Sequence, residues 1–418
     1  MKRRDFLKTG AMVGAGALTV GLTQNHVYGA DAIKIGLIGC GKRGIEAAQQ
    51  CVKAGAGVSV VAVADPLQAN LDAAKTALKA SKACPGMGGC KEVLSDAQVN
   101  LVILATPPAF HPKLITDAIA AGKNVFVEAP VAICMTGTKM VATAAEQAQQ
   151  KKLALMAGLQ NQYDAKVTET LKRIKDGAIG TVLAAQCHLN KGNLPAVKKG
   201  ANETDVAWQL RNWQCMTWLS GESIVSQQVH QLDIINSAFG ALPDSFRGQG
   251  GRVNYRAPEF GNIYDHMGVE LWYPGKNRHV ICMNRFIDGT QERDEVHIAG
   301  SKGTAMPGKI TGATKWEYAG ETGDPFAQEM IELVKSIRAG QPINNGKQAA
   351  DSTLTAVMAR EAGITRNKFN RSFYEAKITQ NLIPPADLKL DAAKPVPPVM
   401  LTGKYKTPGW PGGGKKRR

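Results

Sequence analysis

Short apolar runs alternate with longer amphipathic segments along the first third of the chain. The run at residues 33–38 is dominated by branched apolar side chains, which is typical of a strand buried on both faces. Comparable runs follow at 58–64, 101–105, 124–127 and 153–157, and helical segments are expected between them at 44–53, 67–80, 112–121 and 136–149. This alternation predicts an α/β domain with a doubly wound parallel sheet over residues 31–158.

The pattern changes after residue 158. An amphipathic helix is predicted at 164–176, followed by strand-like runs at 182–189, 246–255, 269–273, 279–286 and 296–299, with one helix among them at 224–239. Short strands with tight turns predict a C-terminal α+β domain with a mostly antiparallel sheet over residues 159–382. Late helices, near 326–337 and 349–362, are expected to pack back on the first domain. Residues 383–418 form a basic tail rich in proline and glycine, predicted to be an extended arm that is disordered or lies over a neighbouring subunit.

Three glycines follow the first run with the spacing G-x-G-x-x-G, at Gly39, Gly41 and Gly44. The first glycine allows a tight turn, the second lets the backbone approach a pyrophosphate, and the third lets the helix lie close to the sheet. The helix N-terminus adds free N–H groups and a positive dipole end. The turn, with Lys42 and Arg43, is therefore predicted to bind a dinucleotide on a Rossmann-type sheet.

Asp65 ends the second run at the spacing expected of a residue that accepts hydrogen bonds from the adenosine ribose. A carboxylate there repels the additional phosphate of NADP, so the predicted cofactor is NAD. Capping of the helix that begins near residue 67 would also explain Asp65, and the two roles are compatible.

Further polar residues follow the other strands, at the sheet edge where ligands bind in such folds. Thr106 and Pro107 follow the third run, Glu128 follows the fourth, and Gln160 follows the fifth. We expect these residues to line the cofactor site with the glycine turn. His111 is included in the set, although capping of a helix is the simpler role for it.

The N-terminus carries Arg3 and Arg4 in the segment Lys-Arg-Arg-Asp-Phe-Leu-Lys, followed by a weakly apolar run at 11–22. This combination is typical of a twin-arginine export signal, and the run is too short and glycine-rich to span a membrane. Residues 1–30 are therefore predicted to direct the folded protein to the periplasm or the extracellular space. NAD would then be bound before export. An uncleaved basic amphipathic start is the alternative.

The net charge of +16 is concentrated partly at the two ends of the chain and is otherwise dispersed. Because no nucleic-acid motif accompanies it, nucleic acid is rejected as the main partner. The eight cysteines include no C-x-x-C pair, and no metal site is predicted. Only Cys84 and Cys90, in a glycine-rich loop, are placed to form a disulfide.

Together these motifs resemble the Gfo/Idh/MocA oxidoreductases over about residues 33–375. The resemblance rests on the glycine turn, Asp65, the Thr-Pro-Pro turn with His111, the Glu128-Ala129-Pro130 segment, and a helix that bears His230 and Asp233. It implies an enzyme that uses NAD or NADP on a sugar or cyclitol held between the nicotinamide and the antiparallel sheet. It also implies a homodimer or tetramer formed through the open face of that sheet.

The chain departs from the family pattern at the residues that handle protons. Ala129 replaces the lysine of Glu-Lys-Pro, and Ser226 replaces the aspartate of Asp-x-x-x-His, while His230 is kept. In the family the lysine lowers the pKa of the reacting hydroxyl, and the histidine takes its proton as general base. Gln162 also stands where arginine is common.

Three functions follow as alternatives. The first is an NAD-dependent oxidoreductase acting on a sugar, cyclitol or related polyol, with His230 as base and helper groups such as His188, Lys191 or Arg211. Asp233 is included in this substrate site. The second resembles the NAD-dependent glycosidases of the same superfamily, which oxidise the sugar transiently and keep NAD bound. The third is a nucleotide-binding pseudoenzyme.

Trp208, Trp213 and Trp218 cluster before the His230 helix, next to Arg211. Aromatic faces beside hydrogen-bond donors are typical of a carbohydrate subsite, and packing in the core is the alternative. Tyr163 is expected either to donate to a substrate hydroxyl or to fill the junction between the domains.

Overall fold

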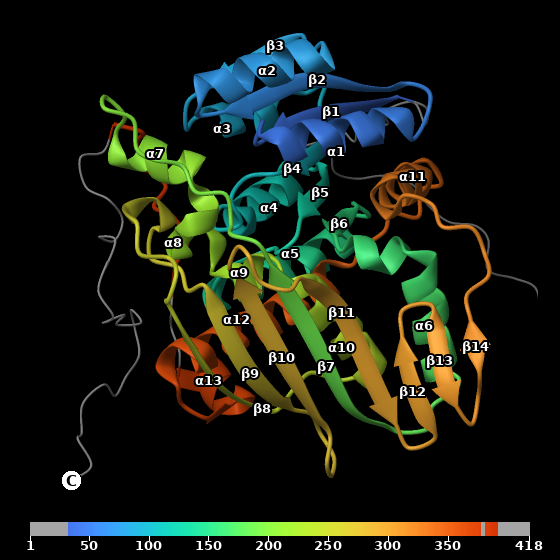
Figure 1. Ribbon diagram of the computed structural model, residues 1–418. Coiled ribbons are helices and arrows are strands. Elements are labelled where there is room, and N and C mark those ends of the chain that lie inside the picture. The colour runs from blue at the N-terminus through green and yellow to red at the C-terminus, as the bar shows by residue number, and fades with distance from the viewer. Residues whose placement is uncertain (1–31, 378–380, 392–418) are drawn as a thin grey trace, which may run out of the picture.

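The computed structural model describes residues 32–377 and 381–391, arranged around two sheets (Figure 1). One sheet has six strands and the other has nine. The predicted fold class, a Rossmann-type parallel sheet followed by an α+β domain with a mostly antiparallel sheet, is confirmed. The predicted export signal and the tail beyond residue 391 lie outside the described residues.

All strands of the first sheet run parallel, in the order β3-β2-β1-β4-β5-β6. They are β1 (Ile33–Ile38), β2 (Val58–Asp65), β3 (Lys82–Pro85), β4 (Leu101–Leu104), β5 (Asn124–Glu128) and β6 (Leu155–Gly158). The strand order reverses between β1 and β4. Loops that leave these two strands therefore diverge, which creates a crevice at their carboxyl ends.

Helices cover both faces of this sheet (Figure 1). They are α1 (Lys42–Lys53), α2 (Gln68–Leu78), α3 (Gly89–Ser95), α4 (His111–Ala120) and α5 (Met135–Gln150). Leu37 packs in one apolar cluster with Ala47 of α1, whereas Ile38 packs in another with Ile115 of α4. Burial on both faces explains the nearly continuous apolar runs of the sequence. The sequence predicted a loop in the region of β3 and α3, because segments this short show no clear hydrophobic periodicity.

The second sheet has the order β14-β13-β12-β11-β7-β10-β9-β8-β15. Its strands are β7 (Val182–Lys191), β8 (Ser245–Gly251), β9 (His266–Trp272), β10 (His279–Phe286), β11 (Arg293–Gly300), β12 (Gly303–Met306), β13 (Lys309–Gly312), β14 (Trp316–Glu317) and β15 (Phe369–Asn370). Among the described strands of this second sheet, only the β7–β10 pair is parallel. Val280 and Cys282 face the helices, while Ile281 and Met283 on the other face are 40% and 41% exposed. One face of this sheet is therefore open.

The helices of this part of the chain are more numerous than the sequence predicted, and several are only three to seven residues long. They are η1 (Gln160–Tyr163), α6 (Ala165–Lys175), α7 (Asp205–Arg211), η2 (Trp213–Cys215), α8 (Thr217–Ser220), α9 (Ser223–Ser226), α10 (Val229–Phe239), η3 (Pro258–Phe260), α12 (Gly346–Thr365) and α13 (Arg371–Lys377). The prediction of one helix at 224–239 is wrong. The backbone leaves helical geometry at Gln227 (φ −122°, ψ −48°), which separates α9 from α10.

The late helix α11 (Pro325–Arg338) packs against the first sheet rather than the second. Its side chains Met330, Leu333 and Val334 belong to the apolar cluster that contains Leu37 of β1. This places α11 beside α1, next to the glycine turn (Figure 1). A residue far along the chain can therefore act on the nucleotide site.

Cys84 and Cys90 are both free thiols, so the disulfide that the sequence allowed is not formed. Cys84 is buried at β3, and Cys90 lies partly buried in α3. The secondary structure of this stretch, rather than a covalent bond, fixes its shape.

Residues 381–391 lie against their own chain. The N–H of Leu382 donates to Cys134 Sγ at 3.4 Å, and the carbonyl of Leu390 accepts from the Thr204 hydroxyl. For these residues the prediction of an arm that is disordered or extends over a neighbour is wrong, because their apolar side chains pack on the second domain's core.

Candidate active site

The glycine turn between β1 and α1 is built by close backbone contacts. Gly39 has φ +95°, and a Cβ on it would lie 2.5 Å from the carbonyl carbon of Ala105. A Cβ on Gly44 would lie 2.1 Å from the Gly39 oxygen, whereas a Cβ on Gly41 would meet nothing within 4 Å. The first and third glycines therefore close the turn, and the second leaves open space before an α1 N-terminus that has no side-chain cap. This geometry fits the pyrophosphate of a dinucleotide.

Asp65 fixes this turn from the end of β2. Its Oδ2 accepts the N–H of Cys40 and its Oδ1 accepts the N–H of Leu67, both at 2.8 Å. The second bond is an Asx turn that leads into α2. Burial raises the pKa of the Asp65 carboxyl, and the backbone N–H bonds oppose that rise. A carboxylate has about four acceptor sites, so lone pairs are left for a ribose.

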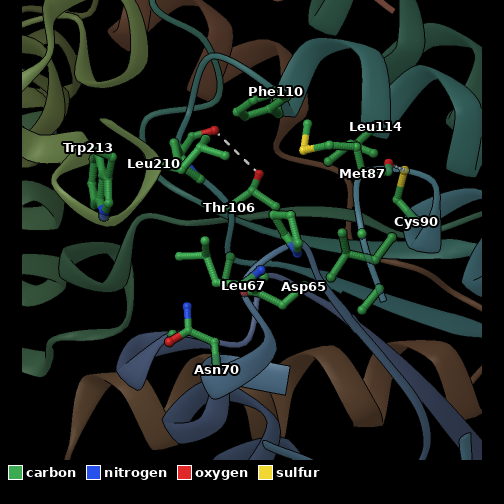
Figure 2. A pocket seen from close by; sticks show the side chains of 18 residues that line it. Asp65, Leu67, Asn70, Met87, Cys90, Thr106, Phe110, Leu114, Leu210 and Trp213 are labelled. Atoms are coloured by element: carbon green, nitrogen blue, oxygen red, sulfur yellow. Dashed lines mark hydrogen bonds between the residues drawn. The ribbon is translucent and has the colours of Figure 1, made fainter. Parts of the chain in front are cut away.

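A pocket opens directly above the turn (Figure 2). Gly41, Asp65 and Asn70 line it together with Thr106 and Pro107. Apolar side chains complete its walls, namely Met87, Cys90, Phe110, Leu114, Leu210 and Trp213. Its cavity volume is about 160 Å³, and the space that is continuous with solvent brings the total to about 790 Å³. Of the predicted cofactor residues, Lys42 points away, with a 92% exposed side chain.

His111 is buried at the start of α4 and ties two loops together. Its Nδ1 lies 2.9 Å from the Pro130 carbonyl and its Nε2 lies 2.9 Å from the Thr106 carbonyl. Burial lowers its pKa to about 4. Its ring contacts carbonyls and makes no cap bond to the helix, so the capping role expected from the sequence is wrong. It instead holds the Thr106 turn against the segment after β5.

Arg43 of the turn lies against two acidic side chains, Glu128 and Glu329. Its Nε donates to Glu128 Oε1 at 2.8 Å, its Nη2 lies 3.7 Å from Glu329 Oε1, and its guanidinium covers the Phe326 ring. Burial raises the pKa of Glu128 to about 6 and that of Glu329 to about 9, with Arg43 opposing both shifts. Glu128, expected at the cofactor, thus serves to anchor the turn. Glu329 was not predicted as a functional residue, because it lies on an apolar helix face and belongs to no motif.

His230 lies in the first turn of α10 with its Nδ1 buried and without a hydrogen-bond partner among the described residues. Burial lowers its pKa to about 4. Three charged groups act on this pKa: Asp294 raises it, and Arg43 and Lys191 lower it. The general base that the resemblance implies is therefore within electrostatic range of Arg43 in α1 and of Lys191 and Asp294 in the second sheet.

The pair Lys191–Asp294 crosses from β7 to β11 with Nζ 2.8 Å from Oδ2. Asp294 Oδ1 also accepts from Gln231 Nε2 at 2.8 Å, and Gln231 donates to the His188 carbonyl at 2.9 Å. Gln231 is the residue next to His230. Asp294 and Gln231 were missed by the sequence, since only the pairing of β7 with β11 brings them to His188 and Lys191.

Asp233 of α10 connects this helix to η1 and α12 through hydrogen bonds. Its carboxylate accepts from Gln162, Ser352 and Gln348 at 3.0, 2.8 and 3.2 Å, and only 2% of the residue is exposed. Gln162, which stands where the family has arginine, therefore bonds to Asp233.

The two replaced positions are at least partly buried, and the segment after β6 is a short 3-10 helix. Ser226 is buried at the end of α9, and Ala129 packs beside the core of the second domain. Gln160 opens η1 directly after β6. Tyr163 packs in the α11 cluster near Glu329, and burial raises its pKa, which is consistent with the junction-filling alternative.

The three tryptophans expected at one carbohydrate subsite have different environments in the structure. Trp208 is buried and donates to the Val197 carbonyl at 2.6 Å, and Trp218 is buried and donates to Gln209 at 2.6 Å. Arg211 is paired with Glu203 at the surface. Trp213 lies in the nucleotide pocket instead.

Within the described part of the chain, no group of three or more His, Cys, Asp or Glu side chains is placed to hold a metal ion. No helix among the described residues is both long and apolar enough to cross a membrane.

The chain belongs to the Gfo/Idh/MocA oxidoreductase family. Residues 33–157 match its NAD-binding Rossmann-fold domain, and residues 167–306 match its C-terminal domain. Residues 1–20 match the signal sequence of the twin-arginine translocation pathway.

Curated relatives match over part of their length. Inositol 2-dehydrogenase of Burkholderia lata is 32% identical over 47% of this chain and 57% of that protein. The 2,7-anhydro-N-acetylneuraminate hydratase of Escherichia coli is 27% identical over 46% of this chain and 47% of that protein. The chain therefore spans about half the length of these relatives. Apo scyllo-inositol dehydrogenase from Lactobacillus casei superposes with a TM-score of 0.63 at 18% identity, covering 82% of this chain and 98% of that one, which establishes the fold.

One pair of substitutions separates the structural role of the glycines in the turn from their role in cofactor binding. Gly44→Ala places a methyl against fixed backbone, so the free energy of unfolding is expected to fall by more than about 2 kcal/mol. Gly41→Ala meets open space and should change stability by less than about 1 kcal/mol, while NADH affinity falls about tenfold or more because the methyl occupies the phosphate approach. Urea unfolding and NADH fluorescence titration check both. Equal loss of stability in the two variants would contradict this account.

Glu329→Gln is expected to stabilise the protein at neutral pH. The folded carboxyl has a raised pKa of about 9, so between about pH 4.5 and 9 folding requires a proton that the unfolded chain has lost, and stability falls as pH rises. The amide removes this cost, about 3 kcal/mol at pH 7, and the difference vanishes near pH 4. Urea unfolding at pH 4 and pH 8 measures it. Glu332→Gln on the same helix, which is partly exposed, is the control, and a Glu329→Gln protein less stable than wild type at pH 8 would refute the prediction.

Proposed function

We propose that the protein is an NAD-dependent oxidoreductase that oxidises a hydroxyl of a sugar, cyclitol or related polyol, with His230 as general base. The observation that carries this proposal is the buried Nδ1 of His230, which has no hydrogen-bond partner among the described residues and lies within electrostatic range of Lys191 and Asp294. An imidazole whose pKa is lowered is neutral at physiological pH and can take the hydroxyl proton. NAD bound at the glycine turn would accept the hydride from the same carbon.

We propose that Lys191 supplies the positive charge that a lysine supplies in the family at the position of Ala129. Removal of the proton by His230 leaves negative charge on the substrate oxygen, and a nearby ammonium stabilises that charge. The side chains of Lys191 and Asp294 are 47% and 55% exposed, so the pair is accessible to a ligand. Asp294 holds Lys191 in place and bonds to Gln231, next to the base.

The polyol class is supported by the inositol dehydrogenases among its relatives and structural neighbours. A second candidate, the glycosidase-like reaction without net oxidation, is favoured by Ala129 and Ser226. The relative named as a hydratase also points to chemistry without net redox change. A nucleotide-binding pseudoenzyme is the third outcome to be tested.

We further propose that the protein acquires NAD in the cytoplasm and works in the periplasm or outside the cell. The twin-arginine signal match supports export, and that route carries folded proteins. We also propose a homo-oligomer formed through the open face of the second sheet. The exposed Ile281 and Met283 on that face support this.

A panel of free sugars, inositols and aryl glycosides separates the three functions. Accumulation of NADH, free or bound, with a free polyol supports the oxidoreductase. Cleavage of a glycoside without accumulated NADH supports the glycosidase-like reaction. Bound NAD without turnover of any compound supports the pseudoenzyme.

His230→Ala is expected to lower kcat by about 10²–10⁴-fold, because the proton acceptor is lost. NADH affinity should stay the same, since His230 lies outside the glycine turn. Steady-state kinetics and NADH titration of the same preparation give both numbers. Activity equal to that of the wild type would remove His230 from the mechanism.

Lys191→Met is expected to lower kcat by about 10²-fold through loss of the charge next to the reacting oxygen. The matched control is Lys113→Met, which removes a similarly paired surface lysine on α4 and should leave kcat unchanged. Steady-state kinetics on both variants decide, and a similar kcat for both would mean that Lys191 has no part in the reaction.

A further inference from the structure

One wall of the nucleotide pocket comes from the second domain. Leu210, at the end of α7, and Trp213, at the start of η2, line the same pocket as Gly41 and Asp65. Figure 2 shows these two side chains on one side of the pocket, with Asp65 between them and the group around Met87. The pocket is therefore shared by segments about 150 residues apart in the sequence.

The chemistry of the pocket fits a nucleoside. Apolar groups form opposite walls, with Met87 and Leu114 on the side of the first domain and Leu210 and Trp213 on the other. Flat aromatic and apolar walls suit a base, since every base presents a π-face. Asp65 provides the acceptor for ribose hydroxyls. This end of the site is therefore the adenosine end.

The segment that carries Leu210 and Trp213 is fixed by buried hydrogen bonds. Asn212, between them, accepts the Val197 N–H at 2.9 Å and donates to the Glu259 carbonyl at 2.7 Å. Farther along, the Leu219 carbonyl accepts the N–H of Ala109, which belongs to the loop before α4, at 3.2 Å. Because both walls are tied to each other, the pocket does not need to close around its ligand.

We propose that Leu210 and Trp213 form a fixed wall against the adenosine half of NAD(H), so that the dinucleotide leaves slowly and stays with the protein as a resident cofactor. The inference rests on the NAD binding of the proposed function and adds to it how the cofactor is retained. It assigns Trp213 to the cofactor, whereas the sequence suggested a carbohydrate contact. A tightly held dinucleotide suits a protein that is exported already folded.

The test is the rate at which bound NADH leaves the full chain, measured by stopped-flow fluorescence after mixing with excess NAD. Trp213→Ala and Leu210→Ala are each expected to raise this rate about tenfold or more, because an apolar contact to the base is lost. Trp213→Phe, which keeps an aromatic face, should stay closer to the wild type. Trp316→Ala is the matched control and should leave the rate unchanged. Trp316 is a partly buried tryptophan of β14 that stacks on the Arg173 guanidinium.

ADP-ribose, which lacks the nicotinamide, identifies the end of the cofactor that is held. Its affinity by calorimetry should fall in Trp213→Ala by the same factor as that of NADH. Unchanged ADP-ribose affinity, or release of NADH from Trp213→Ala and Leu210→Ala within twofold of the wild type, overturns the inference. Wild-type protein that binds no NADH overturns it together with the proposed function. Faster NADH release from a protein that turns over no polyol or glycoside supports the retention while refuting the enzyme.

Discussion

The Asp65 carboxylate is the interaction on which the nucleotide site depends. It accepts N–H groups from the glycine turn after β1 and from the entry to α2. Two loops that leave neighbouring strands are thereby fixed to each other before any ligand arrives. Gly39 and Gly44 press backbone against backbone in the same turn, so no side chain there can adjust the geometry. The Asp65 carboxylate therefore anchors the turn from β2, together with the Ala64 carbonyl, which accepts the N–H of Gly39 at 2.9 Å.

A second set of charges extends this anchor to distant parts of the chain. Arg43 leaves the same turn and meets Glu128 of β5 and the buried Glu329 of α11. It is also one of the charges that act on His230. A single guanidinium therefore connects the phosphate-binding turn, the segment with the missing lysine and the proposed base. This arrangement is costly, because Glu329 is buried without a hydrogen-bond partner of its own among the described residues.

The first domain was predictable because its signals are local. Apolar runs of four to eight residues, the glycine spacing and Asp65 all lie within stretches that a strand, a turn and a helix define. The second domain was less predictable. Its helices from α7 to α9 are four to seven residues long, too short for a hydrophobic period, and the pairing of β7 with β11 that brings Asp294 to Lys191 has no local signal. The position of Trp213 was unpredictable for a similar reason, since the residue type indicated an aromatic contact but only the fold places it in the pocket with Gly41 and Asp65.

The proposed retention of NAD by Leu210 and Trp213 and the replacements at Ala129 and Ser226 both have consequences for the reaction cycle. A single resident NAD accepts one hydride, and a second turnover then requires that the hydride be returned without release of the cofactor. An oxidoreductase built this way needs a carbonyl compound as its second substrate, at the same site. A reaction that oxidises and then reduces one substrate molecule meets the requirement by itself. For such a cycle the base must be able to give its proton back. An imidazole within electrostatic range of a lysine–aspartate pair suits that exchange better than a fixed ammonium at position 129. The histidine is neutral at rest, and Asp294, which raises its pKa, favours the protonated form that the exchange requires.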